Sequence, residues 1–191
     1  MPTQPACLDL LHRASADACG TRPNMHTPLS HHGALAFNPL LPRDVRFLLD
    51  RARALGQAAA AGELGALLRG RKLGLLCEAD GDGDGDLFCR AATELGAHVA
   101  HIRPSLTALS TPHEVQHTAR LLGRLYDAVE CQGMAADLVQ QVGVDAGVPV
   151  YDGVACPTHP TARLADLLDG DACALDKRRL VLQAVLLSTV L

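Results

Sequence analysis

From Pro42 onward, the apolar residues of the chain follow regular periods. In the segment 42–70 they recur at i, i+3, i+4 and i+7, beginning with Val45, which predicts a long amphipathic helix. Beyond this segment, short apolar runs alternate with helical patterns. The runs predict strands over residues 71–78, 97–102, 126–131 and 148–153. The helical patterns cover residues 87–96, 110–125, 134–147 and 159–168.

This alternation of strands and helices predicts the fold class. The order favours an α/β protein in which helices cover both faces of a three-layer parallel sheet of about four strands. The helix over 110–125 has a typical start, since Ser110 or Thr111 can cap it and Pro112 occupies its first turn. The last segment, 176–191, is apolar almost all round after Arg179, so it must be buried against the sheet or the first helix.

The first 36 residues show no lasting period and are rich in Pro, Ser, Thr, His and Gly, which predicts an irregular N-terminal arm. The expected organisation is therefore an arm over 1–36, an α/β domain over 37–170, and a C-terminal helix over 176–191 that packs back on that domain. Three histidines in the arm invite a metal-binding interpretation. A polar tail is favoured, because no cysteine or carboxylate stands beside them at ligand spacing.

Composition narrows the classes of function. Hydrophobic residues make up 48% of the 191 residues and aromatic residues only 3%, which suits an aliphatic core. The net charge of −4, without basic clusters, argues against a nucleic-acid partner. No apolar run reaches the length of a membrane span and the N-terminus lacks a secretory signal, so we expect a cytoplasmic protein with no membrane partner. The seven cysteines include no CxxC pair, and no cofactor is expected.

Several stretches together carry a resemblance to a known family. They are GRKLGLLCE, LFCRAATELGAHV, HTARLLGRLYDAV, AGVPVYDG and HPTARLADLL, in this order. They resemble the N-terminal, carbamoyl-phosphate-binding domain of ornithine carbamoyltransferases, over residues 36–168. The end of the chain, RRLVLQAVLLSTVL, resembles the last helix of the same enzymes, which follows their amino-acid-binding domain. Because only residues 169–175 separate the two pieces, the resemblance implies a transcarbamylase-like chain from which the second domain has been removed.

The resemblance also implies which positions correspond to the family's ligand site. The phosphate loop of the family, Ser-Thr-Arg-Thr-Arg, corresponds to Gly81, Asp82, Gly83, Asp84 and Gly85. Gln132 stands at the position of an arginine, Ala162 at that of a glutamine, and Ala108 at that of a glutamine from the neighbouring subunit. His159 and Arg178 match ligand-contacting residues. For these two we favour structural roles, His159 as a helix cap and Arg178 as the partner of a surface carboxylate.

Aspartates make the inherited loop a poor phosphate site. A phosphate dianion needs charge-assisted donors at a helix N-terminus. Asp82 and Asp84 would instead each repel it by about 1 kcal/mol per unit charge at about 5 Å, and the helix dipole returns only about 0.3–1 kcal/mol. The resemblance therefore implies vestigial ligand positions, no catalytic residue and no transcarbamylase activity. The family's ornithine ligands belong to its second domain, which the resemblance does not include. This also implies that the chain has no transcarbamylase activity.

The same loop has a second interpretation as a cation site. Its four aspartates match the first half of an EF-hand loop: Asp80, Asp82, Asp84 and Asp86. The twelfth position is Ala91 instead of a bidentate glutamate, and the flanks are a strand and a helix instead of two helices. A soluble turn of Gly and Asp, left after phosphate binding was abandoned, is favoured over a metal site.

The sequence favours a degenerate transcarbamylase-like protein that acts as a structural or regulatory, oligomer-forming subunit. Since the family forms trimers through this domain, the resemblance implies a homotrimer or a hetero-oligomer with an active transcarbamylase. Two alternatives stay open. One is a small binding module that uses the loop 80–86 for a cation or a cationic ligand. The other is residual binding of carbamoyl phosphate or an amino acid through His159 and Arg178.

Overall fold

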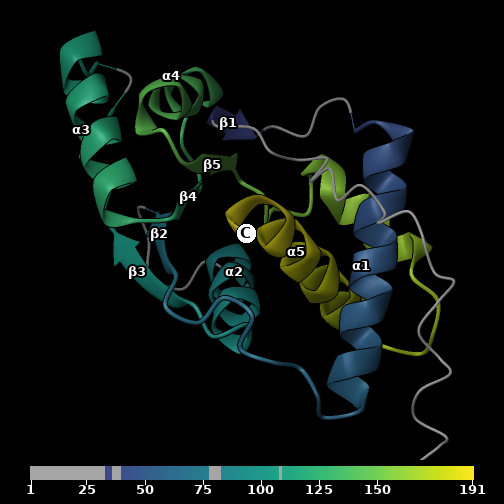
Figure 1. Cartoon of the computed structure of the whole chain (residues 1–191). Helices are drawn as coiled ribbons and strands as arrows, with labels where there is room; N and C mark the ends of the chain where they lie inside the picture. Colours follow the sequence, from purple (N-terminus) through teal and green to yellow (C-terminus); the bar gives the residue numbers. More distant parts are fainter. Residues whose placement is uncertain (1–32, 36–39, 78–82, 108) are drawn as a thin grey trace, which may run out of the picture.

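A five-stranded parallel sheet forms the centre of the molecule (Figure 1). The computed structural model describes residues 33–35, 40–77, 83–107 and 109–191. The strand order is β1-β5-β4-β2-β3, and every neighbouring pair is parallel. The strands are β1 (Gly33–Leu35), β2 (Lys72–Leu76), β3 (His98–Ile102), β4 (Ala128–Cys131) and β5 (Pro149–Asp152). The α/β fold class predicted from the sequence is confirmed.

The sheet has one strand more than the sequence predicts. β1 pairs with β5, with Gly33 beside Pro149 and Leu35 beside Tyr151. This strand lies near the end of the stretch that was expected to be an irregular arm, and residues 1–32 lie outside the described part of the chain. Three residues are too few to show a period of two, so no pattern of apolar positions could indicate this strand.

Helices cover both faces of the sheet. They are α1 (Pro42–Ala60), α2 (Gly83–Glu94), α3 (Pro112–Leu125), α4 (Ala136–Ala146), the 3₁₀ helix η1 (Pro160–Leu167) and α5 (Ala174–Val190). α3 and α4 lie together on one face, and α1, α2, η1 and α5 lie on the other (Figure 1). Each face has its own cluster of buried apolar side chains. The short helix expected over 159–168 is the 3₁₀ helix.

The start of α3 shows the cap that the sequence indicates. Thr111 Oγ1 accepts a hydrogen bond from the backbone N–H of Glu114 at 3.3 Å. In return, the Glu114 carboxylate accepts one from the backbone N–H of Thr111 at 2.7 Å. The hydrogen bonds from Thr111 hold the pKa of Glu114 below its ordinary value. Of the two candidate caps, Thr111 therefore fixes where the helix begins.

α5 is buried along most of its length, as its apolar composition requires. Every residue from Val181 to Ser188 is buried, and the helix packs against α1, α2 and η1. Within this contact, the amide of Gln183 donates to Glu94 Oε2 at 2.9 Å. Arg179 pairs with the same carboxylate at 3.1 Å. These polar contacts fix how α5 lies against α2.

α3 and α4 approach each other closely at Gly123. A Cβ added at this position would lie 1.7 Å from the carbonyl oxygen of Ala146, far inside any permitted contact. Gly147, which follows Ala146, has a φ of 69° and ends α4 in the left-handed conformation. The contact between these helices is therefore fixed by backbone atoms, and it tolerates no side chain at position 123.

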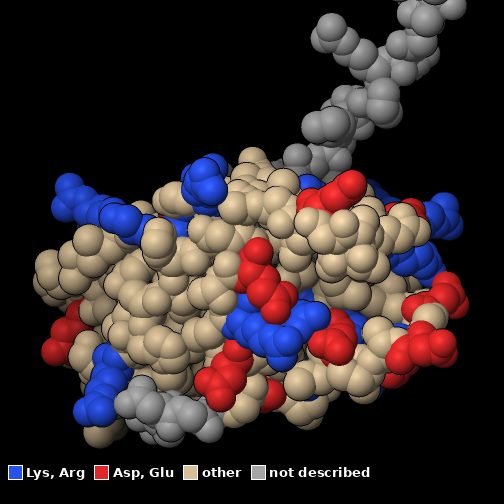
Figure 2. All heavy atoms as spheres, turned by 90° about the horizontal axis from the view of Figure 1, so that it is seen from below, with Lys and Arg blue, Asp and Glu red and all other residues tan. Residues whose placement is uncertain are grey.

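Charges of both signs mix on the surface. Figure 2 shows acidic and basic side chains interspersed on one face, without a continuous basic area among the described residues of that face. Within the described ranges, no helix combines the length and the apolar character needed to cross a membrane.

Candidate functional site

A hollow opens at the carboxyl end of the sheet, where β4 and β5 finish and α2 begins. Its volume is about 530 Å³. Ligands of open parallel sheets bind at this edge. Asp84 comes from the first turn of α2, Gln132 and Asp152 come from the strand ends, and His159 comes from the start of η1. Among the described residues that line the hollow, none is Lys or Arg.

The hollow brings together three positions that the sequence singles out, namely Asp84, Gln132 and His159. Gly85 stands behind Gln132, since a Cβ at position 85 would come within 3.1 Å of Gln132 Oε1. Gly83 is exposed at the start of α2. These positions are separated by up to 76 residues of sequence but meet because parallel strands deliver their carboxyl ends to one edge.

Other positions from the sequence lie elsewhere. Ala162 is half-buried within η1, and neither it nor Arg178 lines the hollow. Arg178 donates to the carbonyl oxygen of Ala155, where a surface carboxylate was expected. The remaining positions of the inherited loop and its neighbour lie outside the described residues: Asp80, Gly81, Asp82 and Ala108.

Glu130 is a buried carboxyl directly behind this edge of the sheet. Glu130 is 0% exposed and lies in the central strand β4, every residue of which is buried. Its Oε2 accepts a hydrogen bond from the backbone N–H of Val154 at 3.2 Å, and its Oε1 has no hydrogen-bond partner among the described residues. Burial raises the pKa of Glu130 well above its ordinary value. The charges of Asp152 and Asp84 raise it further, against the hydrogen bonds from Val154 and Ala155.

Gln132 places a second unsatisfied acceptor at the same edge. The residue is 5% exposed. Its Oε1 has no hydrogen-bond partner within the described part of the chain, and it is turned toward the first turn of α2, which also carries Asp84. An amide oxygen buried without a partner costs free energy, so such a group in a cavity wall calls for an explanation.

His159 has a structural role in its own segment. Its Nδ1 accepts the backbone N–H of Thr161 at 3.3 Å and lies 2.8 Å from Thr161 Oγ1, so the imidazole caps η1. Only 6% of the residue is exposed. Burial lowers its pKa to about 4, which keeps the ring neutral at neutral pH. With Nδ1 accepting, the proton of the neutral ring is assigned to Nε2.

The cation interpretation of the Asp-rich loop stays a prediction. Of its four aspartates, Asp80 and Asp82 lie outside the described residues, while Asp86 is exposed in the first turn of α2. Among the residues that the structure does describe, no group of three or more His, Cys, Asp and Glu side chains is placed to hold a metal ion.

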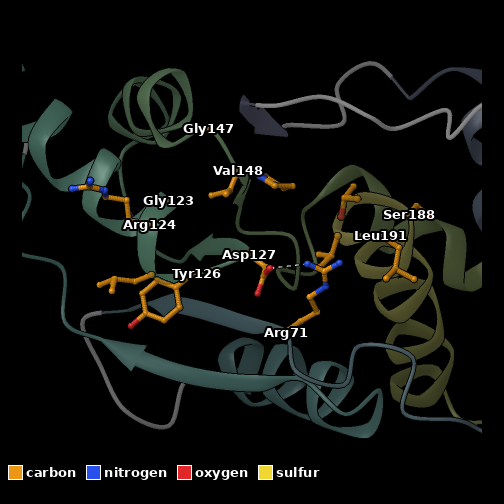
Figure 3. Close-up of a pocket in the computed structure, with 13 residues that line it drawn as sticks. Arg71, Gly123, Arg124, Tyr126, Asp127, Gly147, Val148, Ser188 and Leu191 are labelled. Atoms are coloured by element: carbon orange, nitrogen blue, oxygen red, sulfur yellow. Dashed lines mark hydrogen bonds and ion pairs between the residues drawn. The ribbon is translucent and has the colours of Figure 1, made fainter.

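A second hollow, of about 520 Å³, lies at the amino end of the sheet (Figure 3). Arg71 and Asp127 point toward each other there, with 2.8 Å between Nη1 and Oδ1. Asp127 Oδ2 also accepts the backbone N–H of Lys72 at 2.8 Å. Partial burial works against ionisation, but the hydrogen bonds from Lys72 and Arg71 hold the pKa of Asp127 below its ordinary value. This carboxylate is satisfied within the fold.

Comparison with known proteins identifies the family. The family model described as aspartate/ornithine carbamoyltransferase, carbamoyl-P binding domain, matches residues 34–170, well over half of the chain. The chain belongs to the aspartate/ornithine carbamoyltransferase family. The ornithine carbamoyltransferase of Actinobacillus pleuropneumoniae is 38% identical over 126 residues, which are 66% of this chain and 38% of that protein. The catabolic ornithine carbamoyltransferase of Chromobacterium violaceum is 38% identical over 128 residues, with the same coverage.

Solved carbamoyltransferase structures share the fold. The ornithine carbamoyltransferase of Pyrococcus furiosus superposes with a TM-score of 0.62 at 23% identity, covering 73% of this chain and 44% of that one. Aspartate transcarbamoylase of Trypanosoma cruzi, in complex with carbamoyl aspartate and phosphate, gives 0.59 at 23% identity, covering 74% and 45%. The chain therefore spans less than half the length of these relatives, and the part that it shares with them is the carbamoyl-phosphate-binding domain.

Within this carbamoyltransferase domain, Glu130 and Asp152 are the two residues that sequence reasoning missed. Glu130 interrupts the apolar run of a strand that is otherwise buried, and a charged residue at such a position is rarely buried without a reason. Asp152 ends the following strand. The sequence shows both acidic residues at the carboxyl ends of predicted strands, where a parallel sheet binds its ligands.

Proposed function

We propose that this chain is an oligomer-forming subunit of the carbamoyltransferase family that does not itself bind carbamoyl phosphate or transfer a carbamoyl group. The observation that carries the proposal is the charge of the carboxyl-end hollow. Asp84 and Asp152 line it. A phosphate at about 5 Å from a carboxylate meets a repulsion of about 1 kcal/mol per pair of unit charges even in water, and more in a partly buried site.

Among the described residues that line the hollow, no guanidinium or ammonium group replaces the donors of the family's phosphate loop. Gln132 stands where the resemblance implies an arginine, and its amide cannot supply the charge-assisted, bidentate contact of a guanidinium. Arg178, the arginine that the resemblance matches to a ligand-contacting residue, donates to the carbonyl oxygen of Ala155. Its guanidinium is thereby engaged in holding the turn that leads to η1.

Self-association is the second part of the proposal. The last turns of α3 present Leu121 and Leu125, which are 49% and 52% exposed. Large apolar side chains next to one another on a helix favour burial against another protein surface. The proposed occupant is a second copy of this chain in a trimer, or an active relative in a mixed oligomer, within the cytoplasm expected from the sequence.

Two measurements test the proposal. Calorimetric titration with carbamoyl phosphate is expected to give no heat of binding, and saturable binding would contradict the proposal. Loss of such binding in Gln132→Ala would place it in the hollow, and binding that survives this variant would show an anion site elsewhere. Light scattering is expected to give a mass near three chains. Leu121→Glu with Leu125→Glu should reduce that mass, whereas Leu175→Glu should not. Leu175 is 51% exposed at the start of α5, on the other face of the sheet.

A further inference from the structure

The first turns of α3 contain the pentapeptide HEVQH, residues 113–117. Two histidines four residues apart on a helix lie on the same face, and this is the spacing with which the H-E-x-x-H motif chelates zinc. We propose that His113 and His117 bind a divalent transition-metal ion of the zinc class through two imidazole nitrogens. The inference goes beyond the proposed function, because it concerns neither carbamoyl phosphate nor self-association.

The structure brings both imidazoles to one hollow. This hollow, of about 410 Å³, lies beside the first turns of α3, and His113 and His117 both line it. Both residues are exposed, so a hydrated ion can reach them. Neither ring forms a hydrogen bond with another described residue. His159 is different, because its Nδ1 is engaged by Thr161. The two rings on α3 therefore keep their nitrogens available to a ligand.

The cap of α3 holds the two histidines at chelating distance. Thr111 and Glu114 exchange hydrogen bonds at the start of the helix, and Pro112 occupies its first turn. Without a cap, the first turn of a helix frays, and His113 would leave the helical geometry. Because the backbone from His113 to His117 is already helical, little ordering is needed when both rings bind the same ion.

The same cap argues against the hydrolytic chemistry of this motif. In metalloproteases its glutamate is a general base. Here Glu114 Oε2 accepts the backbone N–H of Thr111 at 2.7 Å and the Thr111 hydroxyl at 2.9 Å. These hydrogen bonds, and less strongly the charge of His113, lower the pKa of Glu114, which makes it a poor base. Its negative charge beside His113 offsets the positive end of the helix dipole, which disfavours a cation. The inference is therefore a binding site and not a peptidase.

The ligand type determines the class of ion. Imidazole nitrogen suits zinc, copper and nickel, whereas magnesium and calcium prefer oxygen ligands. No third His, Cys, Asp or Glu side chain joins the pair among the described residues, so water is expected to fill the remaining positions. A site with two protein ligands binds its ion reversibly and more weakly than a closed structural zinc site with four.

The test is an NMR titration of the full chain with zinc chloride at pH 7.5, followed through the ring nitrogens of the histidines. We expect one nitrogen of His113 and one of His117 to shift together and saturably, and EDTA to reverse both shifts. Magnesium chloride is the control, because it has the same charge but prefers oxygen. Equal responses to both salts, or zinc shifts confined to other histidines, would overturn the inference.

Variants distinguish chelation from two separate contacts. His113→Gln should weaken the binding of zinc to His117 about tenfold, and His117→Gln should do the same at His113, because the second contact of a chelate is intramolecular. His98→Gln is the matched control, since His98 is exposed on β3 and does not line this hollow. An unchanged affinity of the remaining ring in His113→Gln and His117→Gln would show two independent contacts and overturn the inference.

Discussion

The two ends of the sheet carry hollows of nearly the same volume, about 520 Å³ and about 530 Å³. The hollows differ in whether the polar side chains beside them have hydrogen-bond partners. At the amino end, Asp127 is held by Arg71 and by the backbone of Lys72. At the carboxyl end, Glu130 and Gln132 each bury an oxygen that has no partner among the described residues. Size therefore does not distinguish a site from a packing defect, whereas unsatisfied polar groups do.

The amino end depends on backbone packing, and this gives the largest expected effect. Gly123 lines the amino-end hollow, and a Cβ there would meet Ala146 at 1.7 Å. Gly123→Ala should lower the free energy of unfolding by about 3 kcal/mol or more, since α3 and α4 must separate. Urea unfolding followed by circular dichroism measures the loss.

Gly83→Ala is the matched change at the carboxyl end. A Cβ at position 83, which also lies in a helix, meets no atom of the described residues within 4 Å. Its effect should stay within about 0.5 kcal/mol. Equal losses in the two variants would show that the helix contact at the amino end does not matter more than the general cost of replacing a glycine.

Glu130→Gln addresses the buried carboxyl at the carboxyl end. Because the pKa of Glu130 is raised by burial, the folded protein holds its proton at pH values where the unfolded chain has released it. Stability therefore falls as pH rises above the ordinary pKa of a glutamate, through the raised pKa of the folded state. The amide keeps the acceptor for Val154 and cannot ionise.

The two proteins should thus have similar melting temperatures near pH 4, and the variant should melt higher at pH 8. Thermal unfolding over this pH range measures the difference, with Gln132→Ala as a neighbouring variant that removes no titrating group. A constant offset between Glu130→Gln and the natural chain at all pH values would mean that the carboxyl ionises at the same pH whether folded or unfolded.

The comparison also shows what the sequence could and could not predict. The central strands were predictable because burial on both faces makes them continuous apolar runs, as in β2. β1 was not, because three residues carry no period. α2 begins at Gly83, four residues before the predicted start, because Asp84 and Asp86 stabilise the N-terminal end of a helix although they interrupt the apolar pattern.

The candidate site was predictable only in part. The resemblance placed Asp84, Gln132 and His159 together, and the structure brings all three to one hollow. The resemblance did not indicate Glu130. Its signal in the sequence is a charged residue within an apolar run, which does not show that the carboxyl is fully buried or that Oε1 lacks a partner among the described residues. The role of His159 as a cap depends on its hydrogen bond with Thr161. A separation of two residues allows this contact but does not require it.

The smallest expected effect comes from the paired charge at the amino end. Asp127→Asn removes the ion pair with Arg71 and weakens the hydrogen bond from Lys72. The Asp127 side chain is 32% exposed, so solvent screening limits the loss to about 1 kcal/mol at pH 7. Because its folded pKa is lowered, this stabilisation is present above the ordinary pKa of an aspartate and is lost as pH falls through the folded value.

The difference in unfolding free energy between Asp127→Asn and the natural chain should therefore shrink between pH 5 and pH 2, and it should shrink in salt. Glu130→Gln should show its largest difference at the opposite, alkaline side of the pH range, and salt should affect it less because the carboxyl is fully buried. Opposite pH dependences would establish that folding favours the ionised carboxylate of Asp127 at one end of the sheet and the protonated carboxyl of Glu130 at the other. Parallel dependences would remove the distinction between the two hollows.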